Sequence, residues 1–345
     1  MKGLYYHGPR DVRLDTLPDP VLTAPSDIIV KLKACSICGS DLHIYLGHVS
    51  QCAHSIGHEA VGEVVEIGSA VTTLKPGDDV IVSAAIGCGQ CRQCLSRNVM
   101  QCETFHALQS YGIGHRYEGT QSEAFVVPHG DTNAIKIPEG VSVDQAVMLT
   151  DMVPTAWLGV HNAQVTPGDT VVVAGLGPIG LTAVEIALLH GASRVIAVGG
   201  RRRERMAMAE EMGAIAIPSE GALETILDMT KGLGADSFIE AAGAEATLDL
   251  ALKAVRRGGI VSQIGAIFAP VYPFPLVDAL MRNIVFKPAL CSSMQFWHQS
   301  VPLIQQGRFK PERMITHRTG LADAAEAYRM SADGEAGVLK TVMFP

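Results

Sequence analysis

At residues 170–180 the chain reads Thr170-Val171-Val172-Val173-Ala174-Gly175-Leu176-Gly177-Pro178-Ile179-Gly180, and this stretch decides the fold. Its first five residues form an apolar, mostly β-branched run, which is typical of a parallel strand buried on both faces. The glycines follow at once, and the segment after them, through Leu189, predicts a helix. Such glycines let the backbone approach a pyrophosphate group, which the helix N-terminus then stabilises. The alternative is an ordinary strand–helix turn. We predict dinucleotide binding by Gly175, Gly177, Pro178, Ile179 and Gly180.

Outward from this stretch, the sequence shows two kinds of organisation. From residue 153 to about 292, apolar runs alternate with helical segments, which is the pattern of a doubly wound parallel sheet. The expected strands are 170–174, 194–198, 237–240, 260–264 and 284–290, and the expected helices include 204–212 and 245–255. The first 150 residues instead predict a mainly antiparallel β domain, with short strands at 27–32, 60–67 and 80–83 and turns such as 74–78.

The C-terminal segment breaks the alternation. Two amphipathic helical stretches, 297–306 and 321–332, precede a final strand at 338–343, and we expect this segment to return to the first domain. A chain of 345 residues is also too long for one ordinary core. The predicted fold class is therefore α/β, with a discontinuous catalytic domain at 1–152 and 293–345 and a dinucleotide-binding domain at 153–292.

Composition and charge exclude several classes of protein. With 48% hydrophobic residues, 18% charged residues and 35 glycines, the chain fits a compact α/β enzyme. Its formal charge of −8 argues against nonspecific nucleic-acid binding, which requires a basic face. The N-terminus lacks the apolar core of a signal peptide, and the most apolar run, 171–184, is too short and broken to span a bilayer. We expect a cytoplasmic protein with no nucleic-acid or membrane partner, whose eight cysteines are ligands or thiols rather than disulfides.

The end of the second strand of the parallel sheet indicates which dinucleotide binds. In NAD-binding sites an acidic residue about 20 residues after the glycines holds the ribose 2′-hydroxyl. Here the strand ends in Val198-Gly199-Gly200-Arg201, with no carboxylate and with an arginine just beyond. A guanidinium offers paired donors to a 2′-phosphate, so we predict NADP(H) in preference to NAD(H), bound by Gly199, Gly200 and Arg201. For at least one of Arg202, Arg203 and Arg205, the simpler explanation is the solvated basic start of a helix.

Four cysteines predict a structural zinc site. Cys88, Cys91, Cys94 and Cys102 have the spacing C-x2-C-x2-C-x7-C, and Gly87 and Gly89 ease the turns between them. Four thiolates within fifteen residues can surround zinc tetrahedrally and leave no position open for a substrate. An iron–sulfur cluster would favour a final C-x3-C-P spacing, which is absent from this sequence.

A second candidate metal site is incomplete in the local sequence. The segments Cys38-Gly39-Ser40-Asp41-Leu42-His43 and Gly57-His58-Glu59 supply a thiol and an imidazole, both of which are zinc ligands. A catalytic zinc takes three protein ligands and keeps one position open, so a third ligand must come from elsewhere. Asp151 lies at the edge between the two predicted domains and is the candidate. Its alternative role is the N-cap of a helix that starts near Pro154.

Together these motifs resemble the zinc-dependent medium-chain dehydrogenase/reductase family, the alcohol dehydrogenases. The resemblance covers essentially the whole chain, because Cys-Gly-Ser-Asp-Leu-His, Gly-His-Glu, Lys-Pro-Gly-Asp, the four cysteines and the glycine motif occur in the family's order. It implies a GroES-like catalytic domain, a Rossmann domain, and an active site between them. It also implies that Cys38, His58 and Asp151 bind the catalytic zinc. A subgroup similar to bacterial NADP-dependent secondary alcohol dehydrogenases has aspartate as the third ligand and matches Gly199-Gly200-Arg201.

The resemblance implies further roles. Glu59 would lie beside the zinc, either supporting the ligands or binding the metal transiently. Ser40 and then His43 would carry the substrate's hydroxyl proton toward the surface, although His43 can also be read as a polar histidine with satisfied partners. Ile264 and Gly265 would complete the cofactor site, and the family implies a homotetramer. The residues expected to form the substrate wall are Ala85, Tyr111, Leu290 and Cys291.

Two departures leave the substrate open. The best-known members of the NADP-dependent subgroup lack the four-cysteine lobe, and residues 51–56 lack the Phe-Pro pair often found there. The leading hypothesis is hydride transfer between NADP(H) and an alcohol/carbonyl pair, either a secondary alcohol and its ketone or an aldehyde. The alternatives are a polyol or amino-alcohol dehydrogenase of the same family and, in another class, a non-catalytic NADPH-binding protein. The other histidines are expected at surface or packing positions: His7, His48, His54, His106, His115, His129, His161, His190, His298 and His317.

Overall fold

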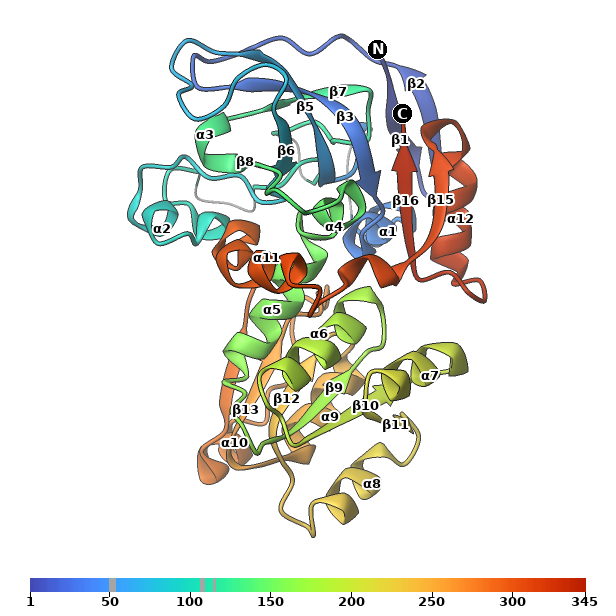
Figure 1. Cartoon of the computed structure of the whole chain (residues 1–345). Helices are drawn as coiled ribbons and strands as arrows, with labels where there is room; N and C mark the ends of the chain where they lie inside the picture. Colours follow the sequence, from blue (N-terminus) through green and yellow to red (C-terminus); the bar gives the residue numbers. More distant parts are fainter. Residues whose placement is uncertain (50–53, 106–108, 114–115) are drawn as a thin grey trace. The chain divides into compact units, whose positions relative to one another are not determined.

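The computed structural model describes residues 1–49, 54–105, 109–113 and 116–345 (Figure 1). The chain divides into two compact units. Unit 1 comprises Met1–Pro154 and Cys291–Pro345, and unit 2 comprises Thr155–Leu290. The two units share no sheet, and each has its own buried hydrophobic cluster. Among the described residues, no helix has both the length and the apolar character that crossing a membrane requires.

Unit 2 contains a six-stranded parallel sheet with the strand order β11-β10-β9-β12-β13-β14. This arrangement confirms the predicted doubly wound parallel sheet. The chain order reverses between β9 and β12, and the crevice outside the carboxyl ends of strands at such a point is where α/β folds bind ligands. The strands are β9 (Thr170–Ala174), β10 (Arg194–Gly199), β11 (Ile215–Pro218), β12 (Ala235–Glu240), β13 (Val255–Gln263) and β14 (Val285–Pro288). The helices are α5 (Met152–Asn162), whose first three residues belong to unit 1, α6 (Pro178–Leu189), α7 (Arg203–Glu211), α8 (Ala222–Met229), α9 (Glu245–Ala254) and α10 (Leu276–Arg282).

The boundaries in unit 2 differ from the prediction where the apolar pattern is weak. Strand β13 begins at Val255, five residues before the predicted start at 260. Its first half contains Gly258 and Gly259, and its register with β12 shifts there, so the sequence shows no continuous apolar run. Strand β11 was not predicted, because only one of its four residues, Ile217, is buried.

Unit 1 contains a seven-stranded sheet and a separate three-stranded sheet. In the larger sheet the order is β15-β16-β3-β5-β6-β8, and β7 also pairs with β3; the smaller sheet has the order β2-β1-β4. The strands are β1 (Lys2–Gly8), β2 (Asp11–Thr16), β3 (Ile28–Ser36), β4 (His54–Ser55), β5 (Glu59–Ile67), β6 (Asp79–Val82), β7 (Ala124–Val127), β8 (Ala134–Lys136), β15 (Ile315–Gly320) and β16 (Lys340–Phe344). The α-helices are α1 (Gly39–Tyr45), α2 (Arg92–Leu95), α3 (Gly130–Asn133), α4 (Val143–Met148), α11 (Trp297–Gln305) and α12 (Ala324–Asp333). The 3-10 helices are η1 (Val99–Gln101), η2 (Ser293–Gln295), η3 (Pro311–Met314) and η4 (Leu321–Asp323).

The C-terminal strand β16 joins the larger sheet of unit 1 beside β3 (Figure 1). Val342 pairs with Ser36 and Met343 with Cys35 in an antiparallel register. On its other side β3 pairs with β5, where Ser36 lies opposite Glu59. The ends of three strands that are distant in sequence therefore meet around residues 36–38.

Candidate active site and metal centres

The pairing of β3 with β5 brings Cys38 and His58 together. Strand β3 ends at Ser36, two residues before Cys38, and β5 begins at Glu59, one residue after His58. Since Ser36 and Glu59 are antiparallel partners, the residues that carry the thiol and the imidazole lie at the same end of this strand pair. Asp151 comes from the segment just before α5.

The side chains of Cys38, His58 and Asp151 converge on one point. Cys38 Sγ lies 3.4 Å from Asp151 Oδ2, and His58 Nε2 lies 3.5 Å from the same oxygen. Zinc bonds of 2.0–2.3 Å in a tetrahedron place neighbouring ligand atoms about 3.3–3.8 Å apart. The observed separations are therefore those of a zinc ligand set, and a Glu59 oxygen lies within 4.8 Å of the same atoms.

Asp41 supports this ligand set, and the sequence analysis did not identify it. It occupies the third position of helix α1, whose N-cap is Cys38, and its Oδ2 accepts a hydrogen bond of 2.9 Å from the Cys38 amide. Its Oδ1 lies 3.1 Å from His58 Nδ1, and both side chains are buried. A carboxylate at Nδ1 favours the tautomer whose Nε2 is free to bind a metal. In the sequence only the spacing indicated this role: Asp41 stands three residues after Cys38, as in a capping box, but Cys and Asp are not the usual residues of that motif.

The electrostatics of the group fit a divalent cation. Burial, above all, and then the charges of Glu59 and Asp151 raise the pKa of the Cys38 thiol. Burial lowers the pKa of His58, but Asp41 and Cys38 outweigh burial and hold it well above its ordinary value. The carboxylates of Glu59 and Asp151 thus disfavour ionisation of the Cys38 thiol, and a bound cation would favour it. A thiolate, an imidazole and a carboxylate are also the donor types that zinc selects.

The four cysteines form a second group of candidate ligands, in unit 1. The Sγ atoms of Cys88 and Cys94 are 3.9 Å apart, as are those of Cys91 and Cys102. A disulfide would require about 2 Å, whereas zinc–sulfur bonds of about 2.3 Å give a tetrahedral edge of about 3.8 Å. Backbone N–H groups of Cys94 and Glu103 donate to Cys91 Sγ. The lobe has the geometry of a closed, four-sulfur metal site.

The thiols of this lobe differ in acidity. Burial raises the pKa of Cys88, but hydrogen bonds from the Thr104 hydroxyl and from backbone N–H groups outweigh burial and lower the pKa to about 6. Burial is the main cause that raises the pKa of Cys94 to about 12. A cation held between the two would stabilise both thiolates, so this set too fits zinc.

The glycine loop of unit 2 has the form that a pyrophosphate site requires. Gly175 has φ +95°, and a side chain there would meet the backbone of Ala242. A Cβ on Gly180 would lie 1.8 Å from Gly175 O. In contrast, the space around a Cβ at Gly177, the N-cap of α6, is open. The loop is thus closely packed on the protein side and accessible at the helix N-terminus.

Two other predicted cofactor residues lie at the same edge of the parallel sheet. Ile264 and Gly265 follow β13, and their amides each donate a 2.9 Å hydrogen bond to Glu240 O at the end of β12. The Glu240 side chain accepts hydrogen bonds from the amides of Ala242 and Gly243. The turns after β9, β12 and β13 are therefore tied together at the point where the strand order reverses.

The arginine cluster begins where β10 ends. Gly199 is the last residue of β10, Gly200 and Arg201 are exposed, and Arg202 is the N-cap of α7. Arg205 Nη1 lies 3.5 Å from Leu176 O, within the glycine loop. Burial chiefly, with a contribution from Arg202, lowers the pKa of Arg205 to about 10. Arg205 therefore lies against the glycine loop, and its position in the sequence did not distinguish it from Arg202 and Arg203.

The residues of the expected proton route lie on and after helix α1. Ser40 Oγ lies 3.4 Å from His58 Nε2, at the candidate metal centre. The Nδ1 atoms of His43 and His48 are 3.3 Å apart. Burial, and then His48, lowers the pKa of His43, so its imidazole is neutral at pH 7 and can accept a proton.

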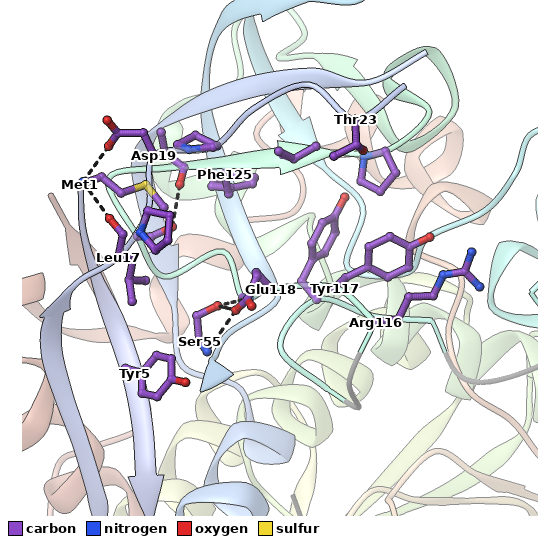
Figure 2. Close-up of a pocket in the computed structure, with 18 residues that line it drawn as sticks. Met1, Tyr5, Leu17, Asp19, Thr23, Ser55, Arg116, Tyr117, Glu118 and Phe125 are labelled. Atoms are coloured by element: carbon purple, nitrogen blue, oxygen red, sulfur yellow. Dashed lines mark hydrogen bonds and ion pairs between the residues drawn. The ribbon is translucent and has the colours of Figure 1, made fainter. Parts of the chain in front are cut away.

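The four residues predicted for the substrate wall are not gathered around one described cavity. A cavity of about 520 Å³ in unit 1 is lined by Tyr111 but not by Ala85, which is buried beside the cysteine lobe. Figure 2 shows this cavity between the N-terminal segment, with Met1 hydrogen-bonded to Asp19, and the segment that carries Arg116, Tyr117 and Glu118. Its walls contain none of the candidate metal ligands. Cys291 is buried in unit 1 and Leu290 is half-exposed at the end of unit 2, so the substrate wall stays a prediction.

Several of the other histidines make local contacts of the expected kind. His106 and His115 lie outside the described residues. Examples of the described contacts are His7 with Asp15, His129 with Ser26, His190 with Ile186 O, His298 with Arg97 and His317 with Thr316.

Comparison with known proteins identifies the family. Residues 24–139 match the alcohol dehydrogenase GroES-like domain, and residues 178–306 match the zinc-binding dehydrogenase domain. The "probable zinc-binding alcohol dehydrogenase" of Mycobacterium tuberculosis is 39% identical over 95% of this chain and 84% of its own length. The alcohol dehydrogenase of Thermus sp. ATN1 has a TM-score of 0.93 at 35% identity, covering 100% of this chain and 99% of that one. A Sinorhizobium meliloti 1021 protein of the zinc-binding dehydrogenase type, bound to NADP, has a TM-score of 0.84 at 28% identity. The match covers 100% of this chain and 99% of that one.

These likenesses define the class as an oxidoreductase built from a GroES-like unit and a Rossmann-like parallel sheet. The chain belongs to the zinc-dependent medium-chain dehydrogenase/reductase family, the alcohol dehydrogenases. The predicted family and α/β fold class are confirmed.

Proposed function

We propose that this chain is an NADP(H)-dependent zinc alcohol dehydrogenase that interconverts a secondary alcohol and its ketone, or acts on an aldehyde. The observation that carries the proposal is the convergence of Cys38, His58 and Asp151 at zinc-ligand separations. A zinc ion held there would polarise an alcohol or carbonyl oxygen as a Lewis acid. Four thiolates would hold a second, structural zinc.

In this proposal the chain's own residues position the ligands and move the proton. Asp41 orients His58, and Ser40 lies beside the metal group, where its hydroxyl can accept the proton of an alcohol. His43, neutral at pH 7, is the proposed acceptor near the surface. Glu59 is held at the edge of the group by Ser36 and Lys340. The glycine loop, with Ile264 and Gly265, would bind the dinucleotide that gives or takes the hydride.

The preference for NADP(H) is supported by charge at the end of β10. That end carries no carboxylate, Arg201 is exposed, and Arg205 lies against the glycine loop. We expect Arg201→Ala and Arg205→Ala to lower the ratio of NADPH to NADH affinity, because a 2′-phosphate loses a charge-assisted donor. Arg203→Ala, on the exposed start of α7, is the matched control. Unchanged ratios in both test variants would contradict the assignment.

We further propose that the chain forms a homo-oligomer, a tetramer by family analogy. Four side chains of α10 are about 70% exposed although they are apolar, namely Leu276, Val277, Leu280 and Met281. Strand β14 lies at the edge of the parallel sheet, next to β13. An edge strand and an exposed apolar helix, both in unit 2, fit pairing with a second copy of the chain. We also propose a cytoplasmic location, where cysteines serve as ligands or thiols; none of the described cysteines is in a disulfide.

Metal analysis tests the proposed function. The wild-type chain should retain two zinc ions, and Cys38→Ser should retain one, because the four-cysteine lobe is independent of Cys38. A polyol or amino-alcohol dehydrogenase would give the same zinc counts and is separated by its substrates. A single zinc in the wild-type chain, confined to the cysteine lobe, would favour the non-catalytic NADPH-binding alternative.

A further inference from the structure

Lys340 is a buried lysine whose ammonium group lies beside the candidate metal centre. Its side chain is only 3% exposed. Its Nζ donates a 3.0 Å hydrogen bond to Ile37 O, at the residue before Cys38. The same Nζ also donates to Glu59 Oε2, at the residue after His58. One ammonium group from the C-terminal strand therefore binds the residue before Cys38 and the residue after His58.

The two carboxylate oxygens of Glu59 have different surroundings. Oε2 accepts hydrogen bonds from Lys340 Nζ and Ser36 Oγ. Oε1 is buried and, among the described residues, has no hydrogen-bond partner. A Glu59 oxygen also lies within 4.8 Å of the ligand atoms of Cys38, His58 and Asp151. Glu59 thus has one oxygen fixed by Lys340 and Ser36 and one buried oxygen without a hydrogen-bond partner among the described residues.

The charges around the candidate metal centre can be balanced in two sets. A Cys38 thiolate and the Asp151 carboxylate would balance a divalent ion, and Lys340 balances Glu59. Without Lys340, Glu59 would be an unpaired carboxylate that is 1% exposed and lies beside a metal. Buried charges in proteins are paired or bind metals, so Glu59 would then compete for the metal position that the substrate oxygen needs.

We propose that Lys340 is a positioning residue that holds Glu59 away from the zinc and thereby keeps one coordination position open. The inference rests on the zinc-dependent activity proposed above and deepens it. It also explains how Glu59 can lie beside the metal without closing the site. Among the described residues, Lys340 Nζ donates to Ile37 O and Glu59 Oε2 and to none of the proposed ligands, so Lys340 acts through Glu59.

The test follows metal coordination directly, without cofactor or substrate. Co²⁺ replaces zinc in the full chain, and imidazole binding to the metal is followed through the Co²⁺ d–d absorption bands. Lys340→Met removes the charge and keeps an unbranched side chain. If Glu59 then occupies the open position, the apparent affinity for imidazole falls at least about tenfold, in proportion to the fraction of open sites. The four-cysteine site contributes a constant background, because four thiolates leave no position for imidazole.

The double variant separates positioning from folding. In Lys340→Met/Glu59→Gln the neutral amide is a poor metal ligand, so we expect imidazole affinity to return to that of Glu59→Gln alone. Lys33→Met is the matched control, because Lys33 forms ion pairs with Glu63 and Asp79 on the same sheet, away from the metal group. It should bind imidazole like the wild-type chain.

Two results would overturn the inference: unchanged imidazole affinity in Lys340→Met, or a loss of affinity that persists in the double variant. If Lys340→Met does not fold, Ser36→Ala removes the other donor to Glu59 and should weaken imidazole binding about threefold; no change would again overturn the inference. A wild-type chain that takes up no Co²⁺ at Cys38 would overturn the proposed function as well. Normal wild-type binding with an insensitive Lys340→Met would overturn only the role of Lys340.

Discussion

Replacing Asp41 by asparagine should selectively weaken the catalytic metal site. Asp41 uses both oxygens: Oδ2 accepts from the Cys38 amide at 2.9 Å, and Oδ1 lies 3.1 Å from His58 Nδ1. An asparagine has one oxygen and one NH2 group, so Asp41→Asn must direct an N–H donor at one of these two donors. If the NH2 group faces the Cys38 amide, the start of helix α1 is disturbed; if it faces His58, the tautomer that binds the metal is disfavoured. Loss of such a supporting partner costs about 10- to 100-fold in metal affinity, or about 1.4–2.7 kcal/mol.

The assay is competition for zinc with a chelator of known affinity at neutral pH, with zinc counted per chain. Asp41→Asn should lose the first zinc at a chelator concentration about 10- to 100-fold lower than the wild-type chain does. The second zinc, in the four-cysteine lobe, should be unaffected. Asp169→Asn is the control, since Asp169 is a hydrogen-bonded carboxylate in unit 2, where its Oδ2 accepts two hydrogen bonds from Thr166. Wild-type zinc retention in Asp41→Asn would refute this account of how the ligands are held.

Three further predictions concern the other parts of the chain. The four-cysteine site should keep zinc at pH 7 and release it below about pH 6. The pKa of Cys88 in the folded chain lies below its ordinary value, so its thiolate is protonated only as the pH falls through about 6. Bound zinc moves the pH of this protonation lower still. Zinc release that begins above pH 7 would contradict this assignment. Gly180→Ala should destabilise unit 2 by about 1–3 kcal/mol and abolish NADPH binding, as followed by thermal unfolding and fluorescence titration, because its Cβ would lie 1.8 Å from Gly175 O. Leu280→Asp, at an apolar side chain that is 70% exposed, should reduce the molar mass measured by light scattering without lowering the melting temperature of the monomer. An unchanged mass would exclude α10 from the interface.

Local chemistry explains why some parts could be predicted from the sequence. Strand β9 runs over the predicted residues 170–174, and the Gly175–Gly180 loop follows it, because close backbone contacts leave no space for a side chain at Gly175 and Gly180. The four cysteines lie within fifteen residues, so their spacing alone determines that they can meet. Signals of this kind depend on neighbours in sequence.

The parts that the sequence did not reveal depend on distant pairing. Lys340 is 281 residues from Glu59, and only the β16–β3–β5 register brings the two side chains together. Helix α1 has seven residues, which is too short for a clear apolar period, so the role of Asp41 in it was missed. The substrate wall depends on side chains from separate segments, and neither spacing nor apolar pattern could define it.

The central claim is that a zinc ion bound by Cys38, His58 and Asp151 enables hydride transfer between NADPH and a carbonyl compound. The most direct measurement is NADPH oxidation over a panel of ketones, aldehydes and ketoses, made on the zinc-loaded chain, after chelation, and after zinc is restored. We predict oxidation that depends on at least one carbonyl compound, disappears on chelation, returns with zinc, and is absent from Asp151→Ala. Oxidation with no member of the panel, or activity that survives complete removal of zinc, would contradict the account.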